Sequence, residues 1–385
     1  MKFLTVTIIT MCMTLALGGG AVAAMVYFGV LGGGDEVLVV FAEKGSAGEI
    51  WTPAPPPIVE YIEEKEPQEE DADDISCPYT VTVLVSAAGD VTLGGDHRWR
   101  GYHEFMREFR ESGYDHSIFF ANVAHIFYES CLSIVNLEGA LTDIIAAPQD
   151  KEFLFRAPPH FAQVLSAGNI DAVTIANNHS RDFGMQGYRD TQDALRYVGV
   201  EYFGNETLLI KEVNGIKVGL FGHSIWADTA ENRRRVTASI ERLRRDGAQL
   251  IIAFNHWGVE LETFPQPYQI NIGRFTLRAG ADLVLGSHPH VIQGIEEYAG
   301  RFIVYSLADF SFGGNANPAD QDAFIFQQKF TFYRGELTPY NETNIIPVFM
   351  SSVRYRNDFQ PTPAEGADAV RILERIARYN EPLNQ

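Results

Sequence analysis

The chain has 385 residues, of which 46% are hydrophobic and 12% aromatic, enough to build a buried core and to exclude a wholly disordered protein. It carries 30 Lys and Arg against 50 Asp and Glu, and the formal net charge of −20 excludes a basic nucleic-acid-binding protein. The length fits one large domain or two ordinary ones.

An apolar segment opens the chain. No residue from Phe3 to Gly34 is charged, and Lys2 is the only basic side chain ahead of this run, which exceeds the ~20 residues that cross a bilayer. We favour an uncleaved membrane anchor, because Met25 to Leu31 continues the apolar run; the alternative is a signal peptide cleaved at Ala21-Val22-Ala23. With Lys2 inside, we expect a single-pass protein of the cell membrane with an extracytoplasmic domain, or a secreted protein if the signal is cleaved.

Residues 35–78 are rich in proline and acid. Between Val59 and Ser76 there are nine acids and one Lys, so 9 − 1 = 8 of the 20 excess negative charges lie there. Such a self-repelling run predicts a solvated linker. We therefore divide the chain into an anchor or signal peptide (1–34), a linker (35–78) and a folded domain (79–385).

Three cysteines occur, and one of them, Cys12, lies in the apolar segment. In an exported domain Cys77 and Cys131 could form a disulfide. Their different distances from the ends of their strands place the two sulfurs out of register, so unpaired thiols are at least as well supported. No Cys-x-x-Cys is present, which argues against a thiolate zinc site.

After residue 79, short apolar runs alternate with longer amphipathic stretches, which predicts an α/β fold of central, mainly parallel β-sheets flanked by helices. Several runs are apolar on both faces, as in a sheet covered on both sides. The expected strands are Thr80 to Ala88, Leu132 to Val135, Ala172 to Ala176, Lys217 to Phe221, Gln249 to Phe254, Asp282 to Leu285 and Phe302 to Leu307. The expected helices include Met185 to Tyr197, Asp228 to Arg245, Gln269 to Arg278, and a last helix capped at Thr362-Pro363-Ala364-Glu365 with Ala369, Ile372, Leu373 and Ile376 on one face.

Five expected strands end in side chains that bind metals. In an open α/β sheet the carboxyl ends of strands converge on one crevice, so these residues should meet there. Carboxylates, amides and imidazoles without thiolate suit Mn, Fe or Zn, and two ions in such a site clamp a phosphoester or amide for hydrolysis. The endings are Gly89-Asp90, Asn136-Leu137-Glu138, Asn177-Asn178-His179, Asn255-His256 and Gly286-Ser287-His288-Pro289-His290.

At these residues the sequence resembles the bacterial capsule synthesis protein CapA family, which is involved in poly-γ-glutamate synthesis and has the calcineurin-like metallophosphatase fold. The resemblance covers about residues 79 to 380. Its motifs are GDVTLGGD (Gly89 to Asp96), NLEGALTD (Asn136 to Asp143), ANNHSRDFG (Ala176 to Gly184), HWGVE (His256 to Glu260), GADLVLGSHPHVIQ (Gly280 to Gln293) and YSLADFSF (Tyr305 to Phe312).

The resemblance implies a dinuclear site of divalent metals, either Mn, Fe or Zn. Asp90 and His290 would hold one ion, Glu138 would bridge, and the second ion would take Asn178, His256 and His288. His179 would act beside them as the general acid.

Two departures from the family pattern concern this site. Where well-characterised metallophosphatases have Asp-x-His, this chain has Asp90-Val91-Thr92, so one ion position is expected to be under-liganded or empty. Where the family has Gly-Asn in YSLGNF, this chain has Ala308-Asp309, which adds a carboxylate that could compensate.

Three more residues are expected to bind substrate. They are Trp257, Glu260 and Asp309, although Trp257 could equally pack its own loop. Arg181 and Asp182 could orient His179, or form only a loop ion pair.

Two hypotheses of function follow. In the first, the protein is a metal-dependent hydrolase: water activated by the metals attacks a phosphoester or amide of an anionic polymer, and His179 protonates the leaving group. In the second, it is a non-catalytic, metal-binding scaffold subunit of a membrane complex that makes and exports the polymer. Both expect membrane association and other complex subunits as partners.

Overall fold

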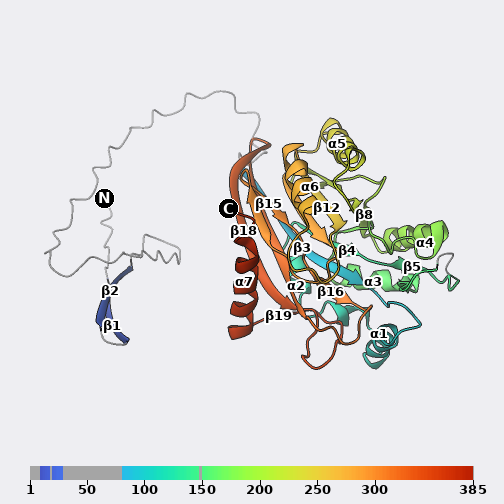
Figure 1. Ribbon diagram of the computed structural model, residues 1–385, viewed down its shortest axis with the longest axis horizontal. Coiled ribbons are helices and arrows are strands. Elements are labelled where there is room, and N and C mark those ends of the chain that lie inside the picture. Colours follow the sequence, from blue (N-terminus) through green and yellow to red (C-terminus); the bar gives the residue numbers. More distant parts are fainter. Residues whose placement is uncertain (1–8, 18–19, 29–79, 147–149, 385) are drawn as a thin grey trace, which may run out of the picture. The chain divides into compact units, whose positions relative to one another are not determined.

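The computed structural model describes residues 9–17, 20–28, 80–146 and 150–384 (Figure 1). The chain divides into two units, Met1–Asp73 and Asp74–Gln385. In the first, β1 (Ile9–Leu17) pairs antiparallel with β2 (Gly20–Phe28). Within the described ranges no helix has the length and apolar character needed to cross a membrane. The linker 35–78 and the remainder of the apolar segment lie outside the described residues, so the anchor stays a prediction.

The second unit contains a large mixed sheet, here the first sheet. Its order is β19-β18-β17-β3-β4-β7-β8, with β16 also beside β3. The strands β3, β4, β7 and β8 are parallel, and three of them match predicted runs. Their bounds are β3 (Thr80–Thr92), β4 (Leu132–Leu137), β7 (Ala172–Thr174), β8 (Glu201–Phe203), β16 (Asp309–Phe312), β17 (Asp322–Tyr333), β18 (Glu336–Phe349) and β19 (Thr362–Pro363).

The second sheet has the order β14-β15-β13-β12-β10-β9, and β11 extends it beside β12. Its centre, formed by β10, β12, β13 and β15, is parallel, as the apolar runs predicted. The strands are β9 (Leu209–Val213), β10 (Ile216–Phe221), β11 (Ser224–Ile225), β12 (Leu250–Trp257), β13 (Leu283–Ser287), β14 (Ile295–Tyr298) and β15 (Arg301–Val304). A small parallel pair joins β5 (Ala140–Leu141) to β6 (Arg156–Ala157).

The two sheets share one hydrophobic core. Alternate residues of β12 point to opposite faces, so one face of this strand enters the shared core and the other faces the helices. Leu250, Ile252 and Phe254 belong to a cluster that also contains Val83 and Val85 of the first sheet. Ile251 and Ala253 belong to the cluster under α5 (Ala230–Arg245) and α6 (Pro267–Arg278). Both faces of β12 are thus buried, which explains its uninterrupted apolar sequence.

Further helices cover the first sheet and its edges (Figure 1). The last of them, α7 (Gly366–Asn380), packs against β18 and β14 and so contacts both sheets. The others are α1 (Arg100–Glu111), η1 (His116–Phe119), α2 (Ala124–Tyr128), η2 (Pro159–Phe161), α3 (Ala162–Ala167) and α4 (Gly184–Tyr197).

The predicted start of the last helix is wrong. Thr362 and Pro363 form β19, which pairs with β18, and α7 begins four residues after Thr362, at Gly366, with Glu365 as its N-cap. On the expected apolar face Ile372 and Ile376 are buried, whereas Leu373 is exposed. Thr362 and Pro363 cannot both pair with β18 and form the first turn of a helix, and in the structure they pair with β18.

Candidate metal centre

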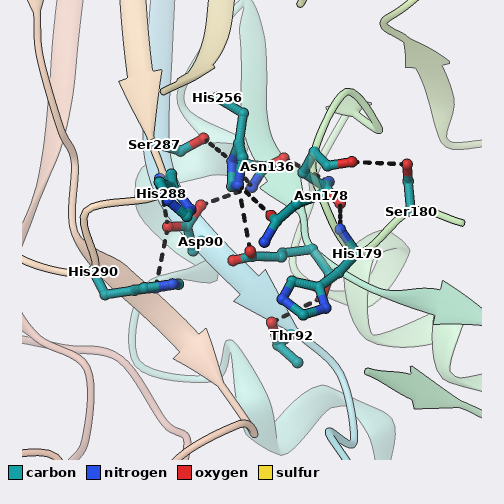
Figure 2. A network of polar contacts seen from close by, with 12 residues as sticks. Asp90, Thr92, Asn136, Asn178, His179, Ser180, His256, Ser287, His288 and His290 are labelled. Atoms are coloured by element: carbon teal, nitrogen blue, oxygen red, sulfur yellow. Dashed lines mark hydrogen bonds and ion pairs between the residues drawn. The ribbon is translucent and has the colours of Figure 1, made fainter. Parts of the chain in front are cut away.

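The side chains at the carboxyl ends of the parallel strands meet where the two sheets face each other (Figure 2). The first sheet contributes Asp90 from β3, Glu138 just after β4 and Asn178 after β7. The second sheet contributes His256 from β12, with His288 and His290 from the loop after β13. The convergence predicted from the strand endings is therefore what the fold produces.

Glu138 lies at the centre of this group. It is fully buried, and neither of its carboxylate oxygens accepts a hydrogen bond from the described part of the chain. Its Oε1 lies 3.4 Å from His256 Nε2. Although burial opposes ionisation, the imidazoles of His290 and His256 lower the pKa of Glu138. A buried carboxylate without hydrogen bonds is costly unless a cation compensates it, so this residue fits a metal ligand.

Two sets of possible ligand atoms share Glu138. In each set the atoms lie within 4.8 Å of one another: Asp90, Glu138 and His290 form one, and Glu138, His256 and His288 form the other. These are the groupings that the family resemblance implies, with Glu138 in the bridging place. A further set joins Glu260, which is exposed, to His288 and His290, so Glu260 lies at the mouth of the site.

The possible ion position around His256 is rich in nitrogen, because two of its ligands, His256 and His288, are imidazoles. His256 Nε2 lies 2.7 Å from Asn178 Oδ1, and its Nδ1 lies 2.9 Å from Ser287 Oγ. His288 is nearly buried, and its Nδ1 has no hydrogen-bond partner among the described residues. Burial, assisted by the neighbouring His256, lowers the pKa of His288 to about 3. A neutral imidazole with an unused nitrogen is the form that binds a metal.

The position around Asp90 is rich in carboxylate. Asp90 accepts hydrogen bonds from Asn136 Nδ2 (2.7 Å) and from the backbone N–H of His288 (3.0 Å). Burial raises the pKa of Asp90 well above its usual range, and the charge of Glu138 adds to this effect. His290 Nδ1 lies 3.5 Å from Asp90 Oδ2, and the pKa of His290 is raised because Asp309 and Glu138 outweigh its burial.

His179 lies beside these ligands (Figure 2). Its Nδ1 lies 2.7 Å from Asp182 Oδ2, and its ring stacks on Phe155 at a centroid distance of 4.1 Å. Asp182 is fully buried and also accepts hydrogen bonds from Lys151 Nζ (2.6 Å) and from the backbone N–H of Phe155 (2.8 Å). The contact to Asp182 therefore orients the ring, which was one of the two alternatives. Arg181 instead faces Glu206 at 3.5 Å.

Two of the expected substrate contacts are not available to substrate. Trp257 is fully buried in the cluster under α5 and α6 and donates its indole N–H to the carbonyl of Tyr305 (2.9 Å), so it packs in that core rather than against its own loop. Asp309 is buried against His290, at 2.8 Å from Nδ1. The exposed tryptophan at the site is Trp226, whose ring lies 4.8 Å from that of His288.

The sequence argument gave no role to several other residues of the site. Asn136 links Asp90 to Asn177, whose amide donates to Asn136 Oδ1 (3.1 Å). Lys151 comes from a loop with no motif of its own. Asn136 stands in a quoted motif, which was the available signal, whereas Trp226 and Lys151 had none.

Cys131, the cysteine whose side chain the structure describes, does not bear on the site. Cys131 is half-buried, with its sulfur 3.5 Å from Asn214 Nδ2, while Cys77 lies outside the described residues.

Comparison with known proteins agrees with these motifs. The sequence model of the family described as bacterial capsule synthesis protein PGA_cap matches residues 84–314. The PGA biosynthesis protein CapA of Bacillus subtilis (strain 168) is 29% identical over 255 residues, 61% of this chain and 64% of that protein. The capsule biosynthesis protein CapA of Bacillus anthracis is 26% identical over 185 residues, 42% of this chain and 45% of that protein.

The matched region spans less than two thirds of the length of these relatives. Among solved structures, a hypothetical protein from Thermus thermophilus is 14% identical with a TM-score of 0.41, over 69% of this chain and 99% of that one, too distant to support an argument. The family match covers more than half of the chain and includes every candidate metal ligand. The protein therefore belongs to the PGA_cap family of bacterial capsule synthesis proteins, whose fold is metallophosphatase-like.

Proposed function

We propose that this protein is a CapA-type capsule synthesis protein that acts as a metal-dependent hydrolase at the cell surface. The observation that supports this most is Glu138, a buried carboxylate without hydrogen bonds that is shared by two sets of ligands next to an oriented histidine. The substrate class is a phosphoester or the amide of an anionic polymer such as poly-γ-glutamate.

Each residue has a distinct part in this proposal. Asp90, Glu138 and His290 would hold one divalent ion, and Asn178, His256 and His288 with Glu138 would hold the other. Two such ions, when bound, polarise the scissile group and activate water. His179, oriented through Nδ1 by Asp182, keeps Nε2 to protonate the leaving group. Glu260 at the mouth is placed to contact the substrate.

The alternative is a scaffold subunit that binds metal without catalysis. Thr92 favours it, because its hydroxyl donates to the backbone carbonyl of Glu138 (2.8 Å) where a ligand is expected. In both cases we propose that the protein is anchored in the cell membrane by residues 1–34, and that it works with other subunits of a polymer synthesis complex.

The test is hydrolysis by the purified full chain, measured with a chromogenic phosphodiester and with poly-γ-glutamate. We expect activity with added Mn²⁺ or Zn²⁺, its loss with a chelator, and its return on adding back the ion. Stoichiometric metal without hydrolysis of either substrate would favour the scaffold. A protein that binds no metal would contradict both forms of the proposal.

A further inference from the structure

Strand β3 contributes one metal ligand fewer than the Asp-x-His pattern of metallophosphatases would supply. Thr92 is fully buried, and its hydroxyl is used to tie β3 to the chain after β4 through the carbonyl of Glu138. The position around Asp90 is thus left with Asp90, Glu138 and His290.

A carboxylate from another strand stands next to this position. In the parallel pairing of β16 with β3, Asp309 is opposite Asp90, whose backbone N–H donates to the carbonyl of Ala308 (2.9 Å). The strands touch so closely here that a Cβ on Gly89 would lie 1.8 Å from that carbonyl oxygen. The backbone therefore fixes Asp309 beside Asp90.

Asp309 contacts the imidazole of the expected ligand His290. Its Oδ1 lies 2.8 Å from His290 Nδ1, closer than Asp90 Oδ2 at 3.5 Å. Because this contact occupies Nδ1 of His290, Nε2 is the ring nitrogen left for an ion. A carboxylate in this place orients a metal-binding histidine and raises its strength as a ligand.

Asp309 also changes the charge of the position. Asp90 and Glu138 are fully buried and Asp309 is 7% exposed, so three carboxylates share one enclosed space. Where the family pattern has an amide, this chain has an acid, which increases the need for a cation. Oxygen-rich sites suit hard ions such as Mn²⁺, whereas the imidazole-rich position suits Zn²⁺ as well.

We propose that Asp309 is a positioning residue that holds His290 with Nε2 free for an ion and offsets the ligand missing at Thr92. The Asp90 position is thereby specialised for a hard divalent cation. This inference rests on the proposed metal-dependent function and replaces the substrate contact expected for Asp309.

The test is Mn²⁺ binding to the full chain. Equilibrium dialysis measures the number and affinity of the bound ions, and electron paramagnetic resonance distinguishes a coupled pair of ions from a single one. We expect two ions in the wild type. Asp309→Ala should weaken one of them by about 10- to 100-fold and abolish the coupled signal. Asp309→Asn should have a smaller effect, because its amide still accepts a hydrogen bond but lacks the charge.

A double-mutant cycle separates positioning from a general loss of structure. If Asp309 acts mainly through His290, then Asp309→Ala in a His290→Ala background should cause a much smaller loss of Mn²⁺ affinity than it does in the wild type. Asp322→Asn, which removes another buried acid of the first sheet, is the matched control and should leave both ions bound.

This inference alone would be overturned if Asp309→Ala bound both ions as tightly as the wild type does. Additive losses of Mn²⁺ affinity in the double-mutant cycle would overturn it as well. A wild-type chain that takes up no Mn²⁺ would overturn the proposed function as well. If Asp309→Ala does not fold, Asp309→Asn decides, and an unchanged Mn²⁺ isotherm for that variant contradicts the inference.

Discussion

His179 and the candidate ligands around it differ in what each would do to a bound ion. His179 is held by Asp182 and Phe155 and belongs to neither set of ligand atoms that contains Glu138. Asp90, in contrast, belongs to one of those sets. Substitutions at the two residues therefore separate chemistry from metal binding.

We expect His179→Ala to keep its metal and its fold and to lose about 10²- to 10⁴-fold in hydrolysis, the usual contribution of a general acid. Asp90→Ala should lose metal and activity together. Metal content, circular dichroism and initial rates measure the three quantities. In cells, normal capsule formation by His179→Ala with failure of Asp90→Ala would show that the ions serve structure only.

Loss of an imidazole from the nitrogen-rich position should lower metal content and thermal stability together. Metal that binds only the folded state stabilises it by RT ln(1 + [L]/Kd), about 2.7 kcal/mol at 100 times Kd. We therefore expect His256→Ala and His288→Ala to melt earlier than the wild type in Zn²⁺ or Mn²⁺. His125→Ala, an exposed histidine in α2, is the control. Equal melting shifts of all variants on adding metal would refute the ligand assignment.

For single residues, the sequence predicted which side chains gather at the site better than it predicted what each side chain contacts. The endings of five strands identified Asp90, Glu138 and the histidines, because metal-ligand side chains at strand ends are a strong coincidence. It could not show that Trp257 points into the core while Trp226 lies at the mouth, since both tryptophans follow or end strands. Which face a side chain takes depends on strand register, and register is not readable from these short runs.

At the scale of elements, ion pairs join α7 to the start of β17. Arg371 and Arg375 both reach Asp322, with Nη1 to Oδ2 distances of 2.6 and 2.9 Å, and Arg375 also pairs with Asp320. Asp322 is 6% exposed. Against the effect of burial, the hydrogen bonds from the two arginines lower the pKa of Asp322 below its usual value.

This pairing predicts a pH-dependent stability. Because the pKa of Asp322 is lower in the folded than in the unfolded state, its stabilisation is complete above the unfolded pKa and is lost as pH falls through the folded one. Asp322→Asn should lower the free energy of unfolding by about 2 kcal/mol at pH 7 and lessen its fall toward pH 3. Urea titrations at several pH values measure this. Asp368→Asn, at an exposed pair with Arg371, should change stability by less than about 0.5 kcal/mol, and an equal effect of both substitutions would contradict the argument.

Parallel strands and long helices were predictable because each is a local pattern of apolar residues. The hairpin of β17 and β18 was not expected, and much of β18 is exposed or half-buried, so it has no continuous apolar run. The start of α7 was misplaced for a related reason. Pairing at a sheet edge is a non-local interaction, and it overrides a local capping pattern.

At the scale of the whole molecule, the apolar segment makes a prediction about topology. If residues 1–34 anchor the chain, the mature protein keeps its original N-terminus, fractionates with membranes and exposes its acidic linker to added protease on intact cells. N-terminal sequencing and cell fractionation measure this. A soluble extracellular protein that begins at Ala24 would show that the segment is a cleaved signal.

The candidate ligands also fall into two blocks along the chain. The carboxylates and the amide come from positions 90 to 178 and the three imidazoles from positions 256 to 290. A ribosome releases the first block long before the second, and neither block alone can chelate an ion as both together do. If the proposed metal site forms, metal capture would be a late step of biogenesis, completed only when the second sheet has docked. On that proposal, the compartment in which folding ends would set which ion the protein acquires, rather than the one in which synthesis begins.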